Sequence, residues 1–396
     1  MRIKSIEANN FKSLVDFKID LGPFNGLIGL NGSGKSTVLQ FVDFASQLIK
    51  GNITEWLKER KWQPSDLKSK LTKKGNIDLK ISFANKKGQE IGYWSANYNP
   101  SMKHCTQERI QFLQSSLEVK KGVVYITLRQ NSNNESNSKI RIPFEYEGSI
   151  LSALKEDLLP RSVLKCKSFL KNMNSLDLLS PEHLRQRTRE SSGALGLGGQ
   201  KLSSFLYELG RVKREDLTSR LRYVYPQLLS VGVKSLRSGW KQLEISEEYD
   251  GMEAGMRGFF PIMRTEARHV NDGMLRLITI LAELQSKHSL LLFDEIENGI
   301  NPEAVEFIID TLTNSDKQVI VTTHSPMILN YLNDEIAKSG IVYLYKTSIG
   351  ISKAIQFFTI PSIAEKLTVM GPGEVFVDTN LTELDKEIQT LDLKGE

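Results

Sequence analysis

GLNGSGKST, residues 29–37, matches the pattern G-x-x-x-x-G-K-S/T. In this pattern the glycines let the backbone curl, so that several N–H groups point at phosphate oxygens. The residues before the motif, 26–29, predict a strand, and residues 35–49 carry apolar positions at helical spacing. A strand, a glycine-rich loop and a helix in this order predict a phosphate-binding loop, because a chance glycine-rich turn would lack both neighbours.

The residues of this phosphate loop (29–37) have separate predicted roles. Lys35 is expected to reach the β- and γ-phosphates, and the Ser36 hydroxyl to bind Mg²⁺. The positive end of the helix dipole adds to phosphate binding. ATP and Mg²⁺ are therefore the predicted cofactors. The predicted nucleotide-binding positions are Gly29, Asn31, Gly32, Ser33, Gly34, Lys35, Ser36 and Thr37.

A second apolar run, residues 290–293, predicts a strand that ends in two carboxylates, Asp294 and Glu295. Asp294 is placed to hold the Mg²⁺ shell, usually through water. Glu295 is placed to polarise the attacking water as general base. An acidic strand end without a role is the alternative, and the phosphate loop in the same chain disfavours it.

Two further motifs fit the same site. His324 follows the apolar run 319–322, where it would contact the γ-phosphate or the attacking water; a structural histidine is the alternative. Asn271, Asp272 and Gly273 precede a helix with apolar spacing over 275–284, and such a helix start attracts anions. A simple helix N-cap is the alternative for these three residues.

These four motifs, in this order, resemble ABC-type ATPases of the SMC/RecF-like branch, which includes small bacterial AAA-family ATPases, OLD-family ATPases and anti-phage ATPases of the Septu and PARIS kind. The opening residues 6–37 and the tail 371–378 are also similar to this branch, and the former places Lys12 near the nucleotide. The resemblance makes 29–37 the Walker A loop, 271–273 the signature loop, 289–295 the Walker B strand, 297–302 the D-loop and His324 the switch histidine. Two departures leave the turnover rate open: Asn271 stands where serine is usual, and the Q-loop glutamine has no evident counterpart.

Strands and helices alternate at both ends of the chain, which predicts an α/β fold with a mixed sheet flanked by helices, an antiparallel β-meander and a helical insertion. The resemblance makes this fold a P-loop NTPase of ABC type. Residues 107–119 read as one strand of the meander, residues 131–138 as a loop, and residues 149–230 as mainly helical, including Leu228. The predicted domains are a split ATPase domain at 1–75 and 240–396, a β subdomain at 76–148 and a helical insertion at 149–239.

Composition narrows the class of protein. Lys plus Arg number 52 and Asp plus Glu 47, and a net charge of +5 is too small to predict a nucleic-acid partner by itself. Two cysteines supply neither a disulfide framework nor a cysteine-rich metal site. No apolar run has the length of a signal peptide or of a membrane span, so a cytoplasmic protein without membrane contact is expected.

Two local basic stretches are candidates for binding DNA, RNA or an acidic protein, although a solvated helix face is the alternative for each. The first contains Lys58, Arg60, Lys61, Lys68, Lys70, Lys73 and Lys74, with Trp56 and Trp62 interleaved. The second contains Arg185, Arg187, Arg189, Arg211, Lys213, Arg214, Arg220 and Arg222.

The resemblance implies an ATPase that dimerises around ATP and controls a separately encoded effector, such as a nuclease or toxin, in bacterial anti-phage defence. A DNA-repair or chromosome ATPase of the RecF or SMC kind is the second hypothesis. A scaffold that binds ATP with little turnover is the third. The neighbouring open reading frame separates the first two hypotheses, and ATP turnover separates both from the third.

Overall fold

The computed structural model describes residues 1–131, 134–176, 179–190, 193–249 and 262–395. A six-stranded sheet forms its centre, in the order β10-β14-β15-β3-β16-β17. The first five strands are parallel, and β17 is antiparallel to β16. The bounds are β3 Phe24–Ile28, β10 Met173–Leu176, β14 Leu290–Phe293, β15 Gln318–Thr322, β16 Ile341–Lys346 and β17 Ser352–Gln356.

The central strands are apolar on both faces, because a core lies on each side of them. In β14, Leu290 and Leu292 belong to one core, whereas Leu291 and Phe293 belong to the other. The first core contains α1 (Lys35–Lys50) and the eight-stranded sheet, and the second contains α8 (Asp272–Leu284) and α9 (Pro302–Thr313). The predicted mixed sheet flanked by helices is confirmed.

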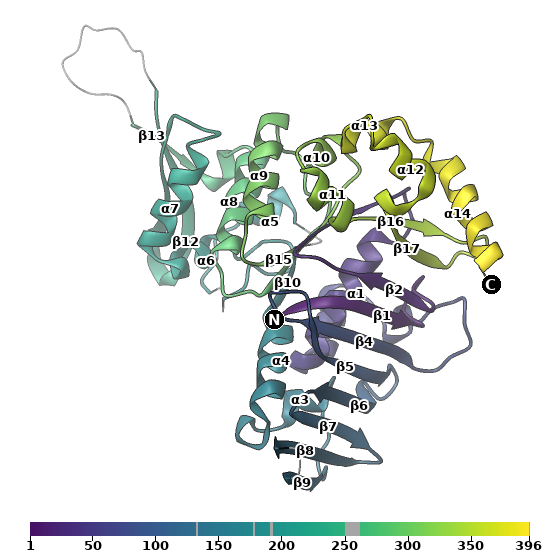
Figure 1. The fold of residues 1–396 in the computed structure, drawn as a ribbon. Coiled ribbons are helices and arrows are strands. Elements are labelled where there is room, and N and C mark those ends of the chain that lie inside the picture. Colours follow the sequence, from purple (N-terminus) through teal and green to yellow (C-terminus); the bar gives the residue numbers. More distant parts are fainter. Residues whose placement is uncertain (132–133, 177–178, 191–192, 250–261, 396) are drawn as a thin grey trace, which may run out of the picture.

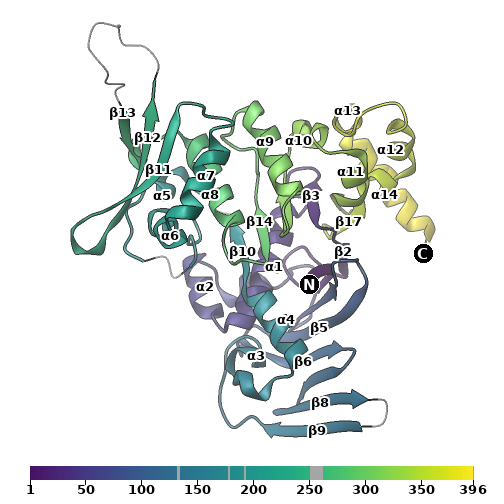
Figure 2. The same cartoon turned by 60° about the vertical axis from the view of Figure 1, so that its left-hand side comes forward.

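An antiparallel sheet of eight strands extends away from α8 and α9 (Figures 1 and 2). Its strands are β1 Arg2–Asn9, β2 Phe17–Asp20, β4 Ile77–Ala84, β5 Glu90–Asn99, β6 His104–Phe112, β7 Ser115–Lys120, β8 Val123–Asn131 and β9 Asn134–Arg141. The prediction of one strand over 107–119 is wrong, because a turn separates β6 from β7. The prediction of a loop over 131–138 is also wrong, since β9 begins at Asn134. Because β1 and β2 join the meander in one sheet, the predicted boundary after residue 75 falls inside that sheet.

The insertion carries strands as well as helices. Its helices are α3 Ile150–Ala153, α4 Arg161–Lys171, α5 Pro181–Leu184, α6 Leu202–Leu209 and α7 Arg211–Leu221. A third sheet consists of β11 Leu228–Ser235, β12 Lys241–Glu248 and β13 Ile262–Glu266. The prediction that 149–230 is mainly helical is therefore wrong at β10 and at Leu228, which begins β11. The sequence pattern also predicts a strand over 259–264, and its first residues lie outside the described part of the chain.

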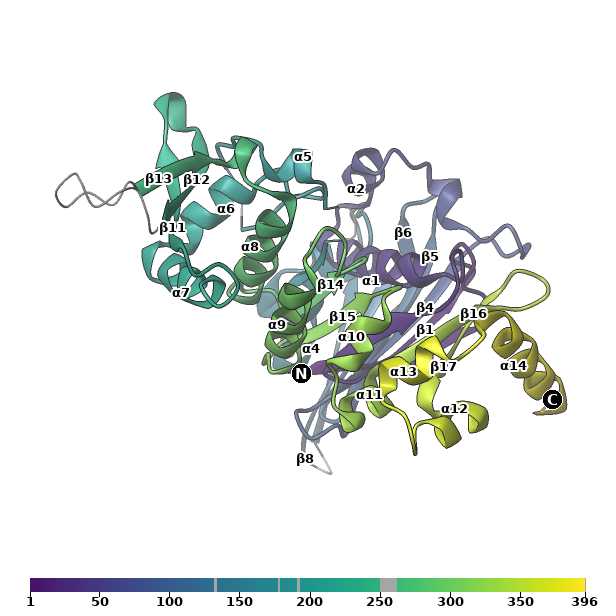
Figure 3. The same ribbon diagram turned by 90° about the horizontal axis from the view of Figure 1, so that it is seen from above.

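The lobe that holds α6, α7 and β11–β13 lies on one side of the molecule, and the C-terminal helices lie on the other (Figures 1 and 3). The remaining helices are α2 Ile53–Glu59, α10 Pro326–Asn330, α11 Asp334–Gly340, α12 Pro361–Lys366, α13 Pro372–Val377 and α14 Leu381–Gly395. Among the helices that the structure describes, none combines the length and the apolar character that crossing a membrane requires.

A buried carboxyl group ties α3 to the eight-stranded sheet. Glu108 of β6 is 2% exposed and accepts hydrogen bonds from the Ile150 N–H (2.6 Å) and the Ser149 hydroxyl (2.5 Å) at the start of α3. The Trp94 indole donates a third bond, at 3.2 Å. Burial raises the pKa of Glu108 to about 7, although these three donors oppose the rise.

We expect this group to make stability depend on pH. Because the folded pKa lies above that of the unfolded chain, the stabilising contribution is full below the ordinary glutamate pKa of about 4.5 and is lost as the pH rises to about 7. The loss is up to about 1.4 kcal/mol per pH unit. Urea unfolding at pH 5.5, 6.5 and 7.5 should show this slope in the wild type, and Glu108→Gln should flatten it. Glu145→Gln, at an exposed position, is the control; equal slopes in all three proteins would contradict the expectation.

Candidate nucleotide site

Three of the predicted motifs follow neighbouring parallel strands. The phosphate loop follows β3, the pair Asp294 and Glu295 follows β14, and His324 lies just after β15. In the register of the sheet, Phe293 lies opposite Val321, and Thr322 lies opposite Leu27. Because the carboxyl ends of parallel strands meet at one edge, segments almost 300 residues apart in the sequence come together there.

The phosphate loop has the backbone that its glycines permit. Gly29, Gly32 and Gly34 have φ values of 141°, 78° and 114°, which residues with a side chain rarely adopt. A Cβ at Gly29 would lie 2.2 Å from the Leu344 carbonyl oxygen, and one at Gly34 would lie 2.4 Å from the Ser352 hydroxyl. Gly29 and Gly34 are therefore required both by the turn and by close packing against β16 and β17, whereas Gly32 is required by the turn alone.

Lys35 begins α1 and points back into the loop. Its ammonium donates to the carbonyls of Gly29 (2.9 Å) and Leu30 (3.1 Å), and the residue is 6% exposed. Burial lowers the pKa of Lys35, and the charges of Asp294, Glu295 and Glu297 oppose that decrease. Three carboxylates from the end of β14 thus act on the ammonium of the phosphate loop.

Thr322, the last residue of β15, connects the predicted Mg²⁺ ligand Asp294 with the predicted general base Glu295. Its hydroxyl donates to Asp294, and it accepts the Glu295 N–H at 2.8 Å. Glu295 itself has a φ of 47°, in the left-handed region that is unfavourable for a glutamate, and it is exposed. Strained backbone of this kind is typical of functional positions.

The predicted signature loop caps α8. The Asn271 side chain accepts the Met274 N–H at 2.8 Å, and the helix begins at Asp272. Gly273 packs directly on the predicted D-loop, because a Cβ there would lie 2.7 Å from the Gly299 carbonyl oxygen. Among the hydrogen bonds and ion pairs of the described residues, none joins 271–273 to the phosphate loop.

Two families of known proteins match parts of this chain. A family described as "AAA ATPase domain" matches residues 1–162, and one described as "AAA domain, putative AbiEii toxin, Type IV TA system" matches residues 243–330. The chain is similar to a solved SMC head bound to the C-winged helix domain of ScpA, with 14% identity, a TM-score of 0.52, and coverage of 90% of this chain and 97% of that chain. It is also similar to the Smc head with an extended coiled coil from Pyrococcus furiosus, bound to the C-terminal domain of ScpA, with 13% identity, a TM-score of 0.52 and coverage of 92% and 99%.

The chain has an SMC/RecF-like, ABC-type ATPase fold. At such low identity the two solved heads establish the fold alone. A comparison with curated proteins gives no match. The family match over 1–162 contains the phosphate loop, and the match over 243–330 contains the signature loop, both carboxylates and His324.

Lys12 lies against α1, the helix that follows the phosphate loop. Its ammonium donates to the Gln40 side chain of α1 at 2.8 Å and lies 3.4 Å from the centre of the Trp62 ring. Gln40, which Lys12 contacts, lies five residues after Lys35 on α1. Its contact with a nucleotide stays a prediction.

Sequence reasoning missed the contacts of Glu297. One of its carboxylate oxygens accepts the His324 N–H (2.9 Å) and the Thr323 hydroxyl (3.0 Å). The other oxygen is buried and has no hydrogen-bond partner among the described residues. Glu297 therefore fixes the backbone that presents the predicted switch histidine. The signal was available in the sequence, as a third carboxylate two residues beyond Glu295.

Sequence reasoning also missed two supports of the site. The Ser352 hydroxyl of β17 donates to the Ser33 carbonyl (2.7 Å) and shares a second hydrogen bond with the Ser13 hydroxyl (2.8 Å), so it supports the phosphate loop from outside. Strand β10 pairs with β14 up to Leu176, opposite Phe293. Strand β10 therefore ends at the edge of the sheet that carries Asp294.

Proposed function

We propose that this chain binds and hydrolyses Mg²⁺–ATP. The observation that carries the proposal is the convergence of the Asp294, Glu295 and Glu297 charges on Lys35 at the carboxyl edge of the parallel sheet. Oxygen donors at Ser36 and Asp294 suit Mg²⁺, which prefers hydroxyl, carboxylate and water oxygens. Phosphate release by the purified chain, compared with Lys35→Ala, tests the proposal; no release above the Lys35→Ala background would refute it.

Each residue of the head has a proposed part in the reaction. Lys35 exchanges its loop carbonyls for phosphate oxygens, and Mg²⁺, when bound, neutralises charge on those oxygens. Glu295 accepts a proton from the attacking water, with Thr322 holding its backbone N–H. His324, held through its own N–H by Glu297, hydrogen-bonds the γ-phosphate or that water.

We further propose that the active form is a pair of chains in head-to-tail, two-fold arrangement. The signature loop has no hydrogen bond or ion pair to the phosphate loop of its own chain within the described residues. In the paired form, the start of α8 in one chain meets the γ-phosphate bound at Lys35 of the other. Each pair then contains two composite sites, and ATP is part of the interface.

A defence function, with a separately encoded nuclease or toxin as effector, is our proposal for the biological role. The matched family whose description names a putative AbiEii toxin supports it. A RecF- or SMC-like repair or chromosome ATPase and a scaffold with little turnover are the alternatives. Co-expression with the product of the neighbouring open reading frame, followed by co-purification with and without ATP, tests the proposal. A neighbour that encodes neither a nuclease nor a toxin would oppose it.

The structure distinguishes the two basic stretches as nucleic-acid candidates. Every Arg and Lys named in the second stretch has a partner within the chain. These partners are Asp272 for Arg185, Glu266 for Arg187, the Trp240 ring for Arg189, Glu215 for Arg211, the Gln285 carbonyl for Lys213, the Leu206 carbonyl for Arg214, Asp216 for Arg220 and the Leu228 carbonyl for Arg222. Internal partners weaken the hypothesis that these side chains follow a phosphate backbone.

The first stretch contains two buried residues that belong to the core and several lysines whose ammonium groups have no internal partner among the described residues. Arg60 and Trp56 are buried and both donate to Asp43, at 2.8 and 2.6 Å, so they belong to the core. The ammonium groups of the remaining lysines make no hydrogen bond or ion pair with any residue that the structure describes. They are Lys58, Lys61, Lys68, Lys70, Lys73 and Lys74. We propose this lysine segment (58–74) as a second functional surface, which contacts the phosphates of a nucleic acid.

We expect charge reversal in the lysine segment to weaken binding to a fluorescent DNA duplex by about tenfold or more, because each lost phosphate contact removes a released counterion. The variant carries Glu at Lys58, Lys61, Lys70 and Lys73. A control with the same change of net charge carries Glu at Lys86, Lys87, Lys165 and Lys338, and it should bind nearly as the wild type does. Wild-type affinity should also fall steeply as salt is raised. Equal losses in the two variants, or binding that ignores salt, would assign the segment to a solvated surface.

A further inference from the structure

Arg185, which directly follows α5, contacts the signature loop. Its guanidinium donates to the Val270 carbonyl at 2.8 Å and forms an ion pair with the Asp272 carboxylate. Two residues on, Arg187 forms a longer ion pair with Glu266, at 3.7 Å. The insertion therefore holds the chain on both sides of Asn271, the residue that caps α8.

Asp272 explains why a cation is needed at this place. The start of a helix attracts anions, but a carboxylate in the first turn opposes a second anion such as a γ-phosphate. Asp272 is exposed and belongs to the signature loop, where its charge would face any phosphate that approaches. Arg185 neutralises this charge, and the charge of Arg276, four residues along the same helix, also acts on Asp272.

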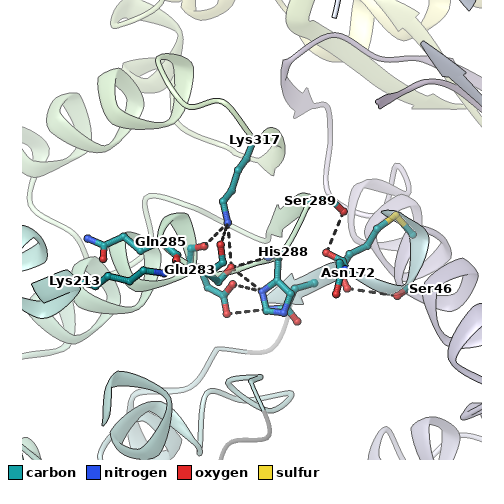
Figure 4. Close-up of polar contacts among 11 residues, drawn as sticks. Ser46, Asn172, Lys213, Glu283, Gln285, His288, Ser289 and Lys317 are labelled. Atoms are coloured by element: carbon teal, nitrogen blue, oxygen red, sulfur yellow. Dashed lines mark hydrogen bonds and ion pairs between the residues drawn. The ribbon is translucent and has the colours of Figure 1, made fainter. Parts of the chain in front are cut away.

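The other end of α8 is fixed independently of Arg185 (Figure 4). The Lys317 ammonium donates to the carbonyls of Glu283 (3.0 Å) and Ser286 (2.8 Å). The Glu283 side chain is fully buried and contacts His288 at 2.6 Å and Asn174 of β10 at 3.0 Å. The C-terminal end of α8 is thus held to the central sheet, and Arg185 acts at the opposite end.

We propose that Arg185 is a positioning residue, which holds the signature loop and screens Asp272 so that the loop accepts the γ-phosphate bound by a second copy of this chain. Through this contact the insertion controls the composite site. The inference rests on the proposed pairing of two chains around ATP. It adds a control point outside the four sequence motifs, on the insertion itself.

The first test separates nucleotide binding from turnover. Arg185→Ala should leave the affinity for a fluorescent ATP analogue within about twofold of wild type, because the phosphate loop is untouched. Its kcat should fall by roughly tenfold or more, because the charge-assisted hydrogen bonds that hold the signature loop and screen Asp272 are lost. Arg185→Lys should recover part of the loss. Arg211→Ala, which removes an exposed ion pair on α7 of the same insertion, is the matched control and should keep the wild-type kcat.

The second test asks whether Arg185→Ala impairs the phosphate loop or the signature loop. An Arg185→Ala subunit has an intact phosphate loop and an impaired signature loop, whereas a Lys35→Ala subunit has the opposite defect. Mixing the two should restore activity. Mixing Arg185→Ala with Asn271→Asp, which impairs the same side, should not.

The outcomes are distinct. A wild-type kcat in Arg185→Ala, loss of analogue binding in that variant, or restoration by both mixtures would each overturn the inference. If the wild-type chain releases no phosphate at all, the proposed hydrolysis fails instead. ATP-dependent association in gel filtration then tests Arg185: wild type should pair and Arg185→Ala should not, and equal pairing would overturn the inference.

Discussion

Glu295→Gln should slow ATP hydrolysis by roughly 10²-fold or more while leaving Mg²⁺–ATP affinity nearly unchanged. Glutamine keeps the size of the side chain and the Thr322 contact of the backbone N–H, but it cannot accept a proton from water at neutral pH. The negative charge of Glu295 attracts the Lys35 ammonium. Because glutamine removes this competing attraction, the contact of Lys35 with phosphate should not weaken. Single-turnover hydrolysis and equilibrium binding of a fluorescent ATP analogue measure the two quantities separately.

Lys35→Ala is the contrasting variant. Here the binding of the analogue itself should weaken, because the ammonium that is surrounded by loop carbonyls and carboxylates is the group that meets the phosphates. The two variants therefore have different expected signatures, a loss of kcat for Glu295→Gln and a loss of affinity for Lys35→Ala. Equal loss of ATP affinity in both would contradict this division of roles.

The second large effect is restoration of activity by mixing. A Lys35→Ala chain and an Asn271→Asp chain, each inactive alone, should regain about a quarter of wild-type activity in an equal mixture, since half of the random pairs are mixed and each mixed pair has one intact composite site. Asn271→Asp keeps the oxygen that caps α8, so the helix start is retained while a negative charge is placed against the γ-phosphate.

The close contact at Gly273 guides this choice of variant. Gly273→Asp would also impair the signature loop, but its Cβ would collide with the Gly299 carbonyl and displace the D-loop as well. If the mixed subunits associate and no activity returns, composite sites that work independently are ruled out. If Asn271→Asp alone keeps full activity, the signature assignment is wrong.

The sequence identified the motifs of this fold because each motif couples a local pattern to a definite chemistry. The phosphate loop, the apolar run into Asp294 and Glu295, and the run before His324 are short and strongly patterned. The pattern also predicted that these motifs belong to the same site, and the structure brings them to one edge because parallel strands place their carboxyl ends together. The family and fold comparisons confirm the ATPase architecture that follows from them.

Other elements lack a local signal. Strand β10 is four residues, Met-Asn-Ser-Leu, with no β-branched residue, and only its pairing with β14 makes it a strand. Leu228 continues an apolar spacing that suits a helix, yet it begins β11 because the partner strand β12 supplies the hydrogen bonds.

Some contacts of the basic residues are long-range as well. Arg185 meets Asp272 across 87 positions of sequence. In the sequence these residues are charges in polar segments, and nothing in the local pattern indicates a partner. Only the tertiary structure separates the internally paired arginines of 185–222 from the unpaired lysines of 58–74.

The left-handed backbone at Glu295 has a consequence for the thermodynamics of the whole chain. A residue with a Cβ is held there at a cost of roughly 1–2 kcal/mol, which glycine would not incur. A screen that rewarded heat resistance alone would therefore favour glycine at 295 and discard the carboxylate. Resistance to heat and capacity for hydrolysis are opposed at this one position, so variants gained by thermal selection need a separate assay of turnover.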